Sequence, residues 1–265
     1  MLLQAQIFSH ALQGETCLNI LLPQELTSRT YPVLYLLHGM YGGPSNWLRY
    51  TSLERYVEER QLVVVLPEGK NSFYLDTSPG SLYETYITEE LPSLIQRLLP
   101  VSDKPEDRFI AGLSMGGYGA VRAALLHPES YGRAGCLSGV LDFKAFFQSL
   151  SPEERPNIPD PSDPRTDLAL LANQAVAAGK KLPPMFISCG TDDMTYPYYL
   201  NARKWLGPLL PAGSVWHTAS GGHDWSYWDA HIQDILNWLP LQKGVAPIIA
   251  PDLPCMSAQS SLIHS

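Results

Sequence analysis

The sequence has little charge and no excess of basic residues. Charged residues make up 17% of the 265 residues, and the formal net charge is -8. Nucleic acid is bound mainly through basic side chains that neutralise its phosphates, so this balance argues against a nucleic-acid partner. Hydrophobic residues make up 45%. Length and composition together predict one large globular domain with a substantial core.

Cysteine is scarce, and long apolar runs are missing. The four cysteines form no C-x-x-C pair, so we expect no zinc or redox site, and nothing in their spacing demands a disulfide. Cys17, Cys136 and Cys189 lie in or beside strand-like apolar runs, where a cysteine usually acts as a small hydrophobe. The first residues contain no basic segment followed by an apolar stretch. We therefore expect no signal peptide, no membrane span and a cytoplasmic location.

Strand-like and helix-like segments alternate along most of the chain. This alternation predicts a mainly parallel sheet with helices on both faces, in which ligands bind at the carboxyl ends of the strands. The predicted strands are residues 18–22, 33–37, 62–66, 108–111, 132–137, 185–189 and 214–219, and the predicted helices are residues 45–59, 83–99 with a new turn or kink at Pro92, 117–126 and 224–239.

Two stretches stand apart from this pattern. Residues 151–164 are rich in proline and acidic side chains, and we expect a surface loop near the site, forming a small lid or insertion within residues 141–182. Residues 244–265 are rich in proline, serine and alanine, and we expect a poorly ordered or loosely docked tail. The predicted catalytic domain is therefore residues 1–243.

The most informative motif is G-L-S-M-G at residues 112–116. It follows a predicted buried strand and precedes a predicted helix, so Ser114 should stand on a sharp strand-to-helix turn with its hydroxyl exposed. Such a turn is crowded, which explains the two flanking glycines. The free N–H groups at the start of the helix favour developing negative charge nearby. This arrangement indicates a serine nucleophile for acyl transfer.

A serine nucleophile needs a base, and in this type of fold the order along the chain is serine, acid, histidine. His223 follows two glycines between the last predicted strand and the last predicted helix. His217 lies within that strand, His231 within that helix and His264 in the tail, so we predict His223 as the base. The plain structural alternative is a loop histidine that caps the helix.

The acid should follow the preceding strand, where Asp192 and Asp193 stand side by side. Neighbouring loop residues usually point in different directions, so we expect one of them to face the histidine and the other to cap the next helix. Spacing alone leaves the choice between them open.

The site also needs two N–H donors for an oxyanion. One belongs to Met115, directly after the nucleophile, and the other should come from the glycine-rich residues 38–43, where Met40 is the candidate. An ordinary glycine turn is the alternative for this second loop.

These motifs together resemble the esterase D group of α/β hydrolases, most closely the bacterial tributyrin-esterase type. The resemblance covers roughly residues 5–240. It implies an α/β-hydrolase fold with the nucleophile after its fifth strand, and a cofactor-free serine carboxylesterase acting on short acyl esters. It also implies Asp193 as the acid, because the family's aspartate stands three places after a glycine, and Met40 and Met115 as the oxyanion donors. The matching segments are residues 36–40, 46–47, 89–91, 112–117, 189–193 and 222–225.

Two departures from the family pattern concern the substrate pocket. Residues 194–196 read M-T-Y where an aromatic and a leucine are common, which would alter the wall beside the acid. The S-formylglutathione hydrolases of the group usually carry a cysteine after the oxyanion strand, but residues 41–45 read Y-G-G-P-S. We therefore rank that thioester below simple esters.

The resemblance leaves several functions open. A thioesterase, a feruloyl or acetylxylan esterase and an acyltransferase are alternatives within the same chemistry. A non-catalytic binding module on a hydrolase scaffold is an alternative of another class. We expect no metal and no cofactor, a small ester as partner, and a chain compatible with a homo-oligomer.

Aromatic side chains are concentrated near the predicted mouth of the site. They could form the wall of an acyl or alcohol pocket, although tryptophans of a last helix often only pack against the sheet. We favour Trp47 and Trp225 as residues near the site. The candidates for the wall are Tyr41, Trp47, Tyr196, Trp225 and Trp228.

Overall fold

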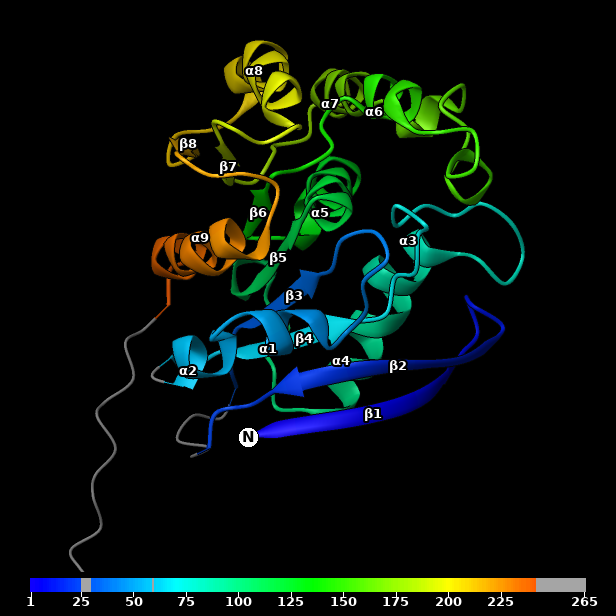
Figure 1. Ribbon diagram of the computed structural model, residues 1–265. Coiled ribbons are helices and arrows are strands. Elements are labelled where there is room, and N and C mark those ends of the chain that lie inside the picture. Colours follow the sequence, from blue (N-terminus) through cyan, green and yellow to red (C-terminus); the bar gives the residue numbers. More distant parts are fainter. Residues whose placement is uncertain (25–29, 59, 242–265) are drawn as a thin grey trace, which may run out of the picture.

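The computed structural model describes residues 1–24, 30–58 and 60–241 (Figure 1). Its centre is an eight-stranded sheet with the order β1-β2-β4-β3-β5-β6-β7-β8. The β1–β2 and β2–β4 pairs are antiparallel and the other pairs are parallel, so the predicted mainly parallel sheet is confirmed. The strands are β1 (Leu2–Ser9), β2 (Gly14–Leu21), β3 (Val33–Leu37), β4 (Val63–Pro67), β5 (Arg108–Leu113), β6 (Arg133–Leu137), β7 (Met185–Gly190) and β8 (Val215–Ala219).

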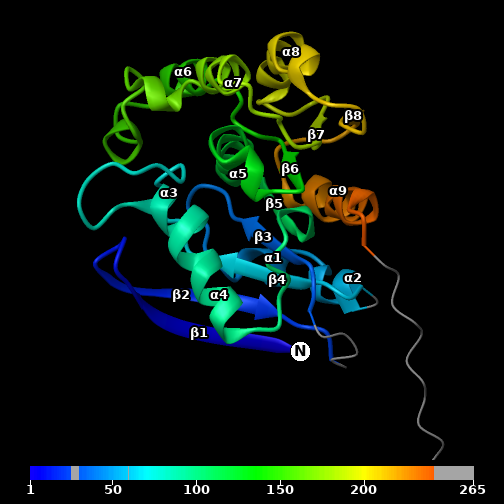
Figure 2. The same ribbon diagram turned by 180° about the vertical axis from the view of Figure 1, so that it is seen from behind.

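Helices cover both faces of the sheet (Figures 1 and 2). Successive strand residues point to opposite faces, so Tyr35 and Leu37 join one buried cluster while Leu34 and Leu36 join the other. The second face is covered by α1 (Asn46–Tyr50), α2 (Leu53–Glu58) and α9 (Trp225–Trp238). The face that carries Tyr35 and Leu37 is covered by α3 (Tyr83–Thr85), α4 (Leu91–Leu98), α5 (Met115–Leu126), α6 (Phe143–Ser149), α7 (Leu168–Ala177) and α8 (Tyr196–Trp205).

The helix predicted over residues 45–59 is two short helices instead. Thr51 is extended between them, with φ -134° and ψ 170°. Its hydroxyl accepts the Leu53 N–H at 3.1 Å, and the Ser52 N–H donates to Asp229 on α9 at 2.9 Å. A side-chain contact and a tertiary contact therefore replace the bonds of a continuous helix.

The disturbance predicted at Pro92 is a wider turn rather than a break. Residues Tyr86–Glu90 form a π-helical turn between α3 and α4, in which the Leu91 N–H donates to the Tyr86 carbonyl five residues back. Pro92 then lies in the first turn of α4. Because proline has no N–H, it cannot donate the bond that position 92 would otherwise make to the preceding π-turn, yet the chain stays helical through it.

Two regions differ from the sequence-based expectations, and a third lies outside the described residues. Strand β1 was not expected, because its exposed residues carry a weak apolar pattern. Residues 141–182 contain two full helices, and α7 packs against α5, so much of this segment is an ordinary crossover from β6 to β7. Its residues 151–164 form turns and a short 3-10 helix, Arg155–Asn157. The predicted tail, residues 244–265, lies outside the described residues, as do His264 and the domain end at residue 243.

Two further sequence-based expectations concern cysteines and membrane spans. Cys136 and Cys189 are buried free thiols, as expected of small hydrophobes, whereas Cys17 on β2 is free but exposed. Within the described ranges, no helix combines the length and apolarity needed to cross a bilayer.

Candidate active site

Ser114 stands at the sharp turn between β5 and α5. Its backbone has φ 51° and ψ -117°, a conformation that residues other than glycine rarely adopt. A Cβ added to Gly112 would lie 2.4 Å from the Gly116 carbonyl carbon, and one added to Gly116 would lie 2.6 Å from the Leu37 carbonyl oxygen. Only glycine fits these two positions, so the predicted crowded turn is present.

The structure brings Ser114, His223 and Asp193 into one hydrogen-bonded chain. Nε2 of His223 lies 2.9 Å from the Ser114 Oγ. Nδ1 of His223 lies 2.9 Å and 3.0 Å from the two carboxylate oxygens of Asp193. The Asp193 side chain is 0% exposed and the His223 side chain is 23% exposed. Nδ1 therefore carries the proton that faces the carboxylate, which leaves Nε2 free to accept the serine proton.

Hydrogen bonds keep the buried carboxylate of Asp193 charged. Its Oδ1 accepts from the Thr195 N–H at 2.7 Å and from the Thr195 hydroxyl at 2.8 Å. Burial raises the pKa of Asp193, but hydrogen bonds and charge from His223, with smaller contributions from Thr195 and Ser138, outweigh burial and hold the pKa below its ordinary value. Asp193 is thus an anion at neutral pH, suited to orient and stabilise an imidazolium.

Asp192 has a different place. It is exposed, and its backbone N–H donates to the Gly221 carbonyl at 3.1 Å. It does not cap α8, whose N-cap residue is Thr195, so the capping role expected for the second aspartate is not found. The geometry thus distinguishes two residues that spacing alone left equal.

Ser138, at the end of β6, is a site residue that the sequence reasoning missed. Its φ is 51°, and its hydroxyl accepts the Trp228 indole N–H at 3.1 Å. The Trp228 ring packs edge-on against the His223 imidazole, with ring centroids 5.0 Å apart. Ser138 therefore connects the acid to the aromatic wall behind the base. One signal in the sequence could have indicated it: Ser138 directly follows a predicted strand, and that strand comes next after the one that carries the nucleophile.

The two expected oxyanion donors lie at the end of β3 and the start of α5. Among the described residues, no protein acceptor takes the N–H of Met40 or Met115. The buried His38 ring shapes the first loop, because its Nδ1 lies 2.7 Å from the Gly39 carbonyl and its Nε2 accepts the Gly69 N–H at 2.9 Å. Neither N–H group therefore has a competing acceptor among the described residues.

The predicted pocket aromatics divide into core and surface. Trp47 is 1% exposed and donates its indole N–H to the Leu37 carbonyl at 3.0 Å, so it belongs to the core behind the oxyanion loop. Trp228 is also buried. Trp225 is half-buried, with its ring packed edge-on against both Trp47 and Trp228. Tyr41 is 67% exposed, and Tyr196 is half-buried and stacked on Tyr199.

Known proteins resemble this chain over most of its length. The model of the family named Esterase, described as "Putative esterase", matches residues 9–239. The chain belongs to this esterase family. It is a serine ester hydrolase with the α/β-hydrolase fold, as the sequence motifs predict.

Relatives of this esterase match nearly their whole length. An acetyl esterase of Caldicellulosiruptor saccharolyticus is 27% identical, over 90% of this chain and 97% of the relative. Fluorophosphonate-binding serine hydrolase F of Staphylococcus aureus, solved with substrate bound, is 28% identical with a TM-score of 0.83, over 90% of this chain and 98% of that one. An S-formylglutathione hydrolase of the same species is 28% identical with a TM-score of 0.81 and the same coverage.

Proposed function

We propose that this esterase hydrolyses short-chain acyl esters through an acyl-enzyme, with Ser114 as nucleophile, His223 as general base and Asp193 as the orienting acid. The observation that carries the proposal is the hydrogen-bonded chain from the Ser114 Oγ to the His223 Nε2, and from the His223 Nδ1 to Asp193. The family membership of the chain supports the same chemistry.

The reaction follows from the positions of the protons. His223 Nε2 takes the proton of Ser114 as the Oγ attacks the ester carbonyl carbon. The carbonyl oxygen becomes an oxyanion and accepts hydrogen bonds from the Met40 and Met115 N–H groups. The tetrahedral intermediate collapses, the alcohol leaves with the proton from His223, and the acyl group stays on Ser114. Water repeats the sequence, releasing the carboxylic acid and free Ser114.

Asp193 acts through the imidazole. Its carboxylate fixes the tautomer in which Nε2 is free, and it stabilises the positive charge on His223 after proton transfer. Its burial strengthens this interaction, because little water screens the charge there.

The proposed pocket is lined by Tyr41, Tyr196 and Trp225, with Trp47 supporting Trp225 from the core. The carboxylate of Glu154 accepts the Ser151 N–H at 2.9 Å, and hydrogen bonding to Ser151 holds the pKa of Glu154 below its ordinary value. We expect residues 151–164 to form a small lid beside the oxyanion loop, within a catalytic domain of residues 1–243. One relative is an acetyl esterase, which supports a short acyl group in the substrate.

S-formylglutathione is the second candidate substrate, because an S-formylglutathione hydrolase is 28% identical to this chain. Residues 41–45 lack the cysteine that this resemblance leads us to expect, so simple oxygen esters rank first.

The experiment compares wild type with Ser114→Ala on p-nitrophenyl esters of rising acyl length and on S-formylglutathione. Ser114→Ala should lower kcat at least about 10⁴-fold while circular dichroism stays unchanged. Ser93→Ala is the matched control, since Ser93 is exposed on α4, which covers the opposite face from α9. Highest kcat/KM on acetyl to butyryl esters supports the proposal. A Ser114→Ala rate equal to wild type contradicts the mechanism, and a preference for the thioester reverses the ranking.

A further inference from the structure

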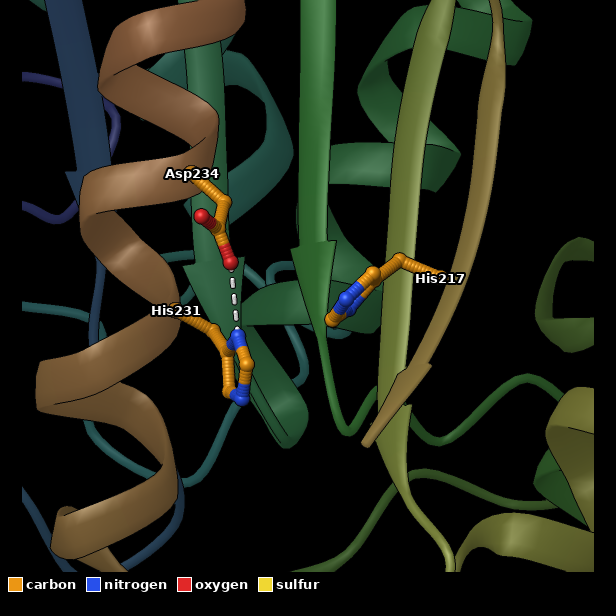
Figure 3. A group of neighbouring side chains, drawn as sticks. All are labelled: His217, His231 and Asp234. Carbon is orange, nitrogen blue, oxygen red and sulfur yellow. Dashed lines mark hydrogen bonds and ion pairs between the residues drawn. The ribbon is translucent and has the colours of Figure 1, made fainter. Parts of the chain in front are cut away.

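Three side chains with metal-binding atoms gather between the edge strand β8 and helix α9. Figure 3 shows His217 pointing from the strand toward the helix, where His231 and Asp234 project from neighbouring turns. One nitrogen or oxygen of each residue lies within 4.8 Å of those of the other two. Nδ1 of His231 is 2.7 Å from the Asp234 carboxylate, and the two imidazole centroids are 5.0 Å apart.

The donor set fits a zinc ion. Two imidazole nitrogens and one carboxylate oxygen are ligands that Zn²⁺ takes, with bonds of about 2.0–2.2 Å. Tetrahedral bonds of this length place neighbouring ligand atoms about 3.3 Å apart, so the cluster needs small side-chain rotations to close around the ion. Asp234 is free to make them because its side chain is 43% exposed. The same exposure gives the ion a path from solvent and leaves room for a water as fourth ligand.

Neighbouring groups already orient the histidines as metal ligands need. The Ser188 hydroxyl lies 3.1 Å from Nδ1 of His217, which leaves Nε2 of that ring as the ligand atom. Ser188 is in turn 2.6 Å from the Tyr227 hydroxyl. The Tyr227 ring packs against His231, with centroids 4.1 Å apart. Hydrogen bonds of this kind from outside the ligand set fix the ring and raise metal affinity.

We propose that His217, His231 and Asp234 form a Zn²⁺ site that joins β8 to α9. These two elements flank residues 220–224, the loop that carries His223. By joining β8 to α9, the ion holds the two ends of this loop together, and it takes no part in ester hydrolysis. This proposal is independent of the function proposed above, because none of the three zinc ligands is Ser114, His223 or Asp193.

The test is zinc binding to the full-length protein stripped with a chelator, measured by competition with a chromophoric chelator. Wild type should bind one equivalent of Zn²⁺. The variants His231→Gln and Asp234→Asn should each weaken binding at least about 10-fold. His10→Gln is the matched control, since His10 is exposed on the β1–β2 turn, and its affinity should equal that of wild type. At a Zn²⁺ concentration 100 times the Kd, the wild-type Tm should rise by about 5–10 °C, and the Tm of His231→Gln should not.

Two further measurements separate this site from other zinc-binding groups. Co²⁺ in place of Zn²⁺ should give the intense visible bands of a tetrahedral site in wild type and lose them in His217→Gln. His10→Gln, His217→Gln, His231→Gln and Asp234→Asn should keep wild-type esterase activity in chelator, which shows that they fold. Unchanged zinc affinity in His231→Gln and Asp234→Asn would overturn the proposal. Loss of zinc binding in His223→Gln would also overturn it, because the ion would then lie at the hydrogen-bonded residues Ser114, His223 and Asp193.

Discussion

Gly190 and Gly221 meet backbone to backbone at the carboxyl ends of β7 and β8. A Cβ added to Gly190 would lie 2.1 Å from the Gly221 carbonyl oxygen. The same oxygen accepts the Asp192 N–H, and the Thr191 N–H donates to the Ala219 carbonyl at 2.9 Å. The loop with the proposed acid and the loop with the proposed base are therefore held together as one unit.

Gly190→Ala should separate these two loops. The added methyl group forces the Gly221 backbone away, and overpacking of this kind costs about 1–3 kcal/mol. Because the displaced loop carries His223, we expect kcat/KM to fall about 10–100-fold, together with a lower Tm. Gly207→Ala is the control, since its Cβ would meet only the Trp216 indole nitrogen, at 3.7 Å. Equal activity of the two variants would show that the contact between the loops does not position His223.

Asp193→Asn should be far more damaging than Asp192→Asn. An amide at position 193 offers the wrong hydrogen-bond pattern to Nδ1 of His223, so we expect kcat to fall about 10³–10⁴-fold. Asp192 is exposed and does not contact the histidine, so its amide variant should stay within about 2-fold of wild type. Steady-state kinetics on p-nitrophenyl acetate measures both, and the reverse ranking would assign the acid to Asp192.

Ser138→Ala removes the acceptor of the Trp228 indole N–H, and it removes one of the groups that lower the pKa of Asp193. A lost hydrogen bond of this kind costs about 1–2 kcal/mol, so we expect kcat to fall about 5–30-fold with little change in KM. A positioning role also predicts a changed pH–rate profile, because Ser138 helps to lower the pKa of Asp193. An unchanged kcat and profile would confine Ser138 to packing.

Glu90 should contribute stability that acid removes. Its carboxylate accepts hydrogen bonds from the Ser9 hydroxyl at 2.6 Å and from the N–H groups of His10 and Ala11 at 2.8 Å and 3.1 Å. Burial raises its pKa, but these bonds outweigh burial and hold the pKa below the ordinary 4.5. The folded-state pKa is the lower one, so the contribution is complete above about pH 4.5 and is lost as the pH falls through the folded-state pKa.

Glu90→Gln should therefore lower the Tm by about 2–4 °C at pH 7, equivalent to about 1 kcal/mol for a partly exposed carboxylate. The difference from wild type should shrink below pH 4. Glu89→Gln is the control, because Glu89 is exposed and its side chain has no hydrogen-bond partner among the described residues. A difference that grows toward acid pH would contradict the assignment.

The sequence was sufficient for the parallel sheet and for the residues at its carboxyl edge, because buried strands and glycine turns leave strong local patterns. The strand β3 was predicted with its observed bounds, and His223 was placed by its position between β8 and α9. The break at Thr51 depends on Asp229, which is 177 residues away from its partner Ser52, so no local pattern could show it.

The same limit applies within the site. Asp192 and Asp193 have the same chemistry, and only the path of the chain decides which of them faces the imidazole. The roles of Ser138 and Trp228 depend on a hydrogen bond between residues 90 positions apart. Trp47 was expected near substrate, but its indole N–H bonds to the Leu37 carbonyl and its ring lies in the core.

Activation of the Ser114 hydroxyl by His223 can be measured by covalent labelling with a fluorophosphonate probe and mass mapping of the modified peptide. We expect one adduct, on Ser114, which forms far more slowly in His223→Ala and at the wild-type rate in His231→Gln. An adduct on another residue, or labelling of His223→Ala at the wild-type rate, would contradict it.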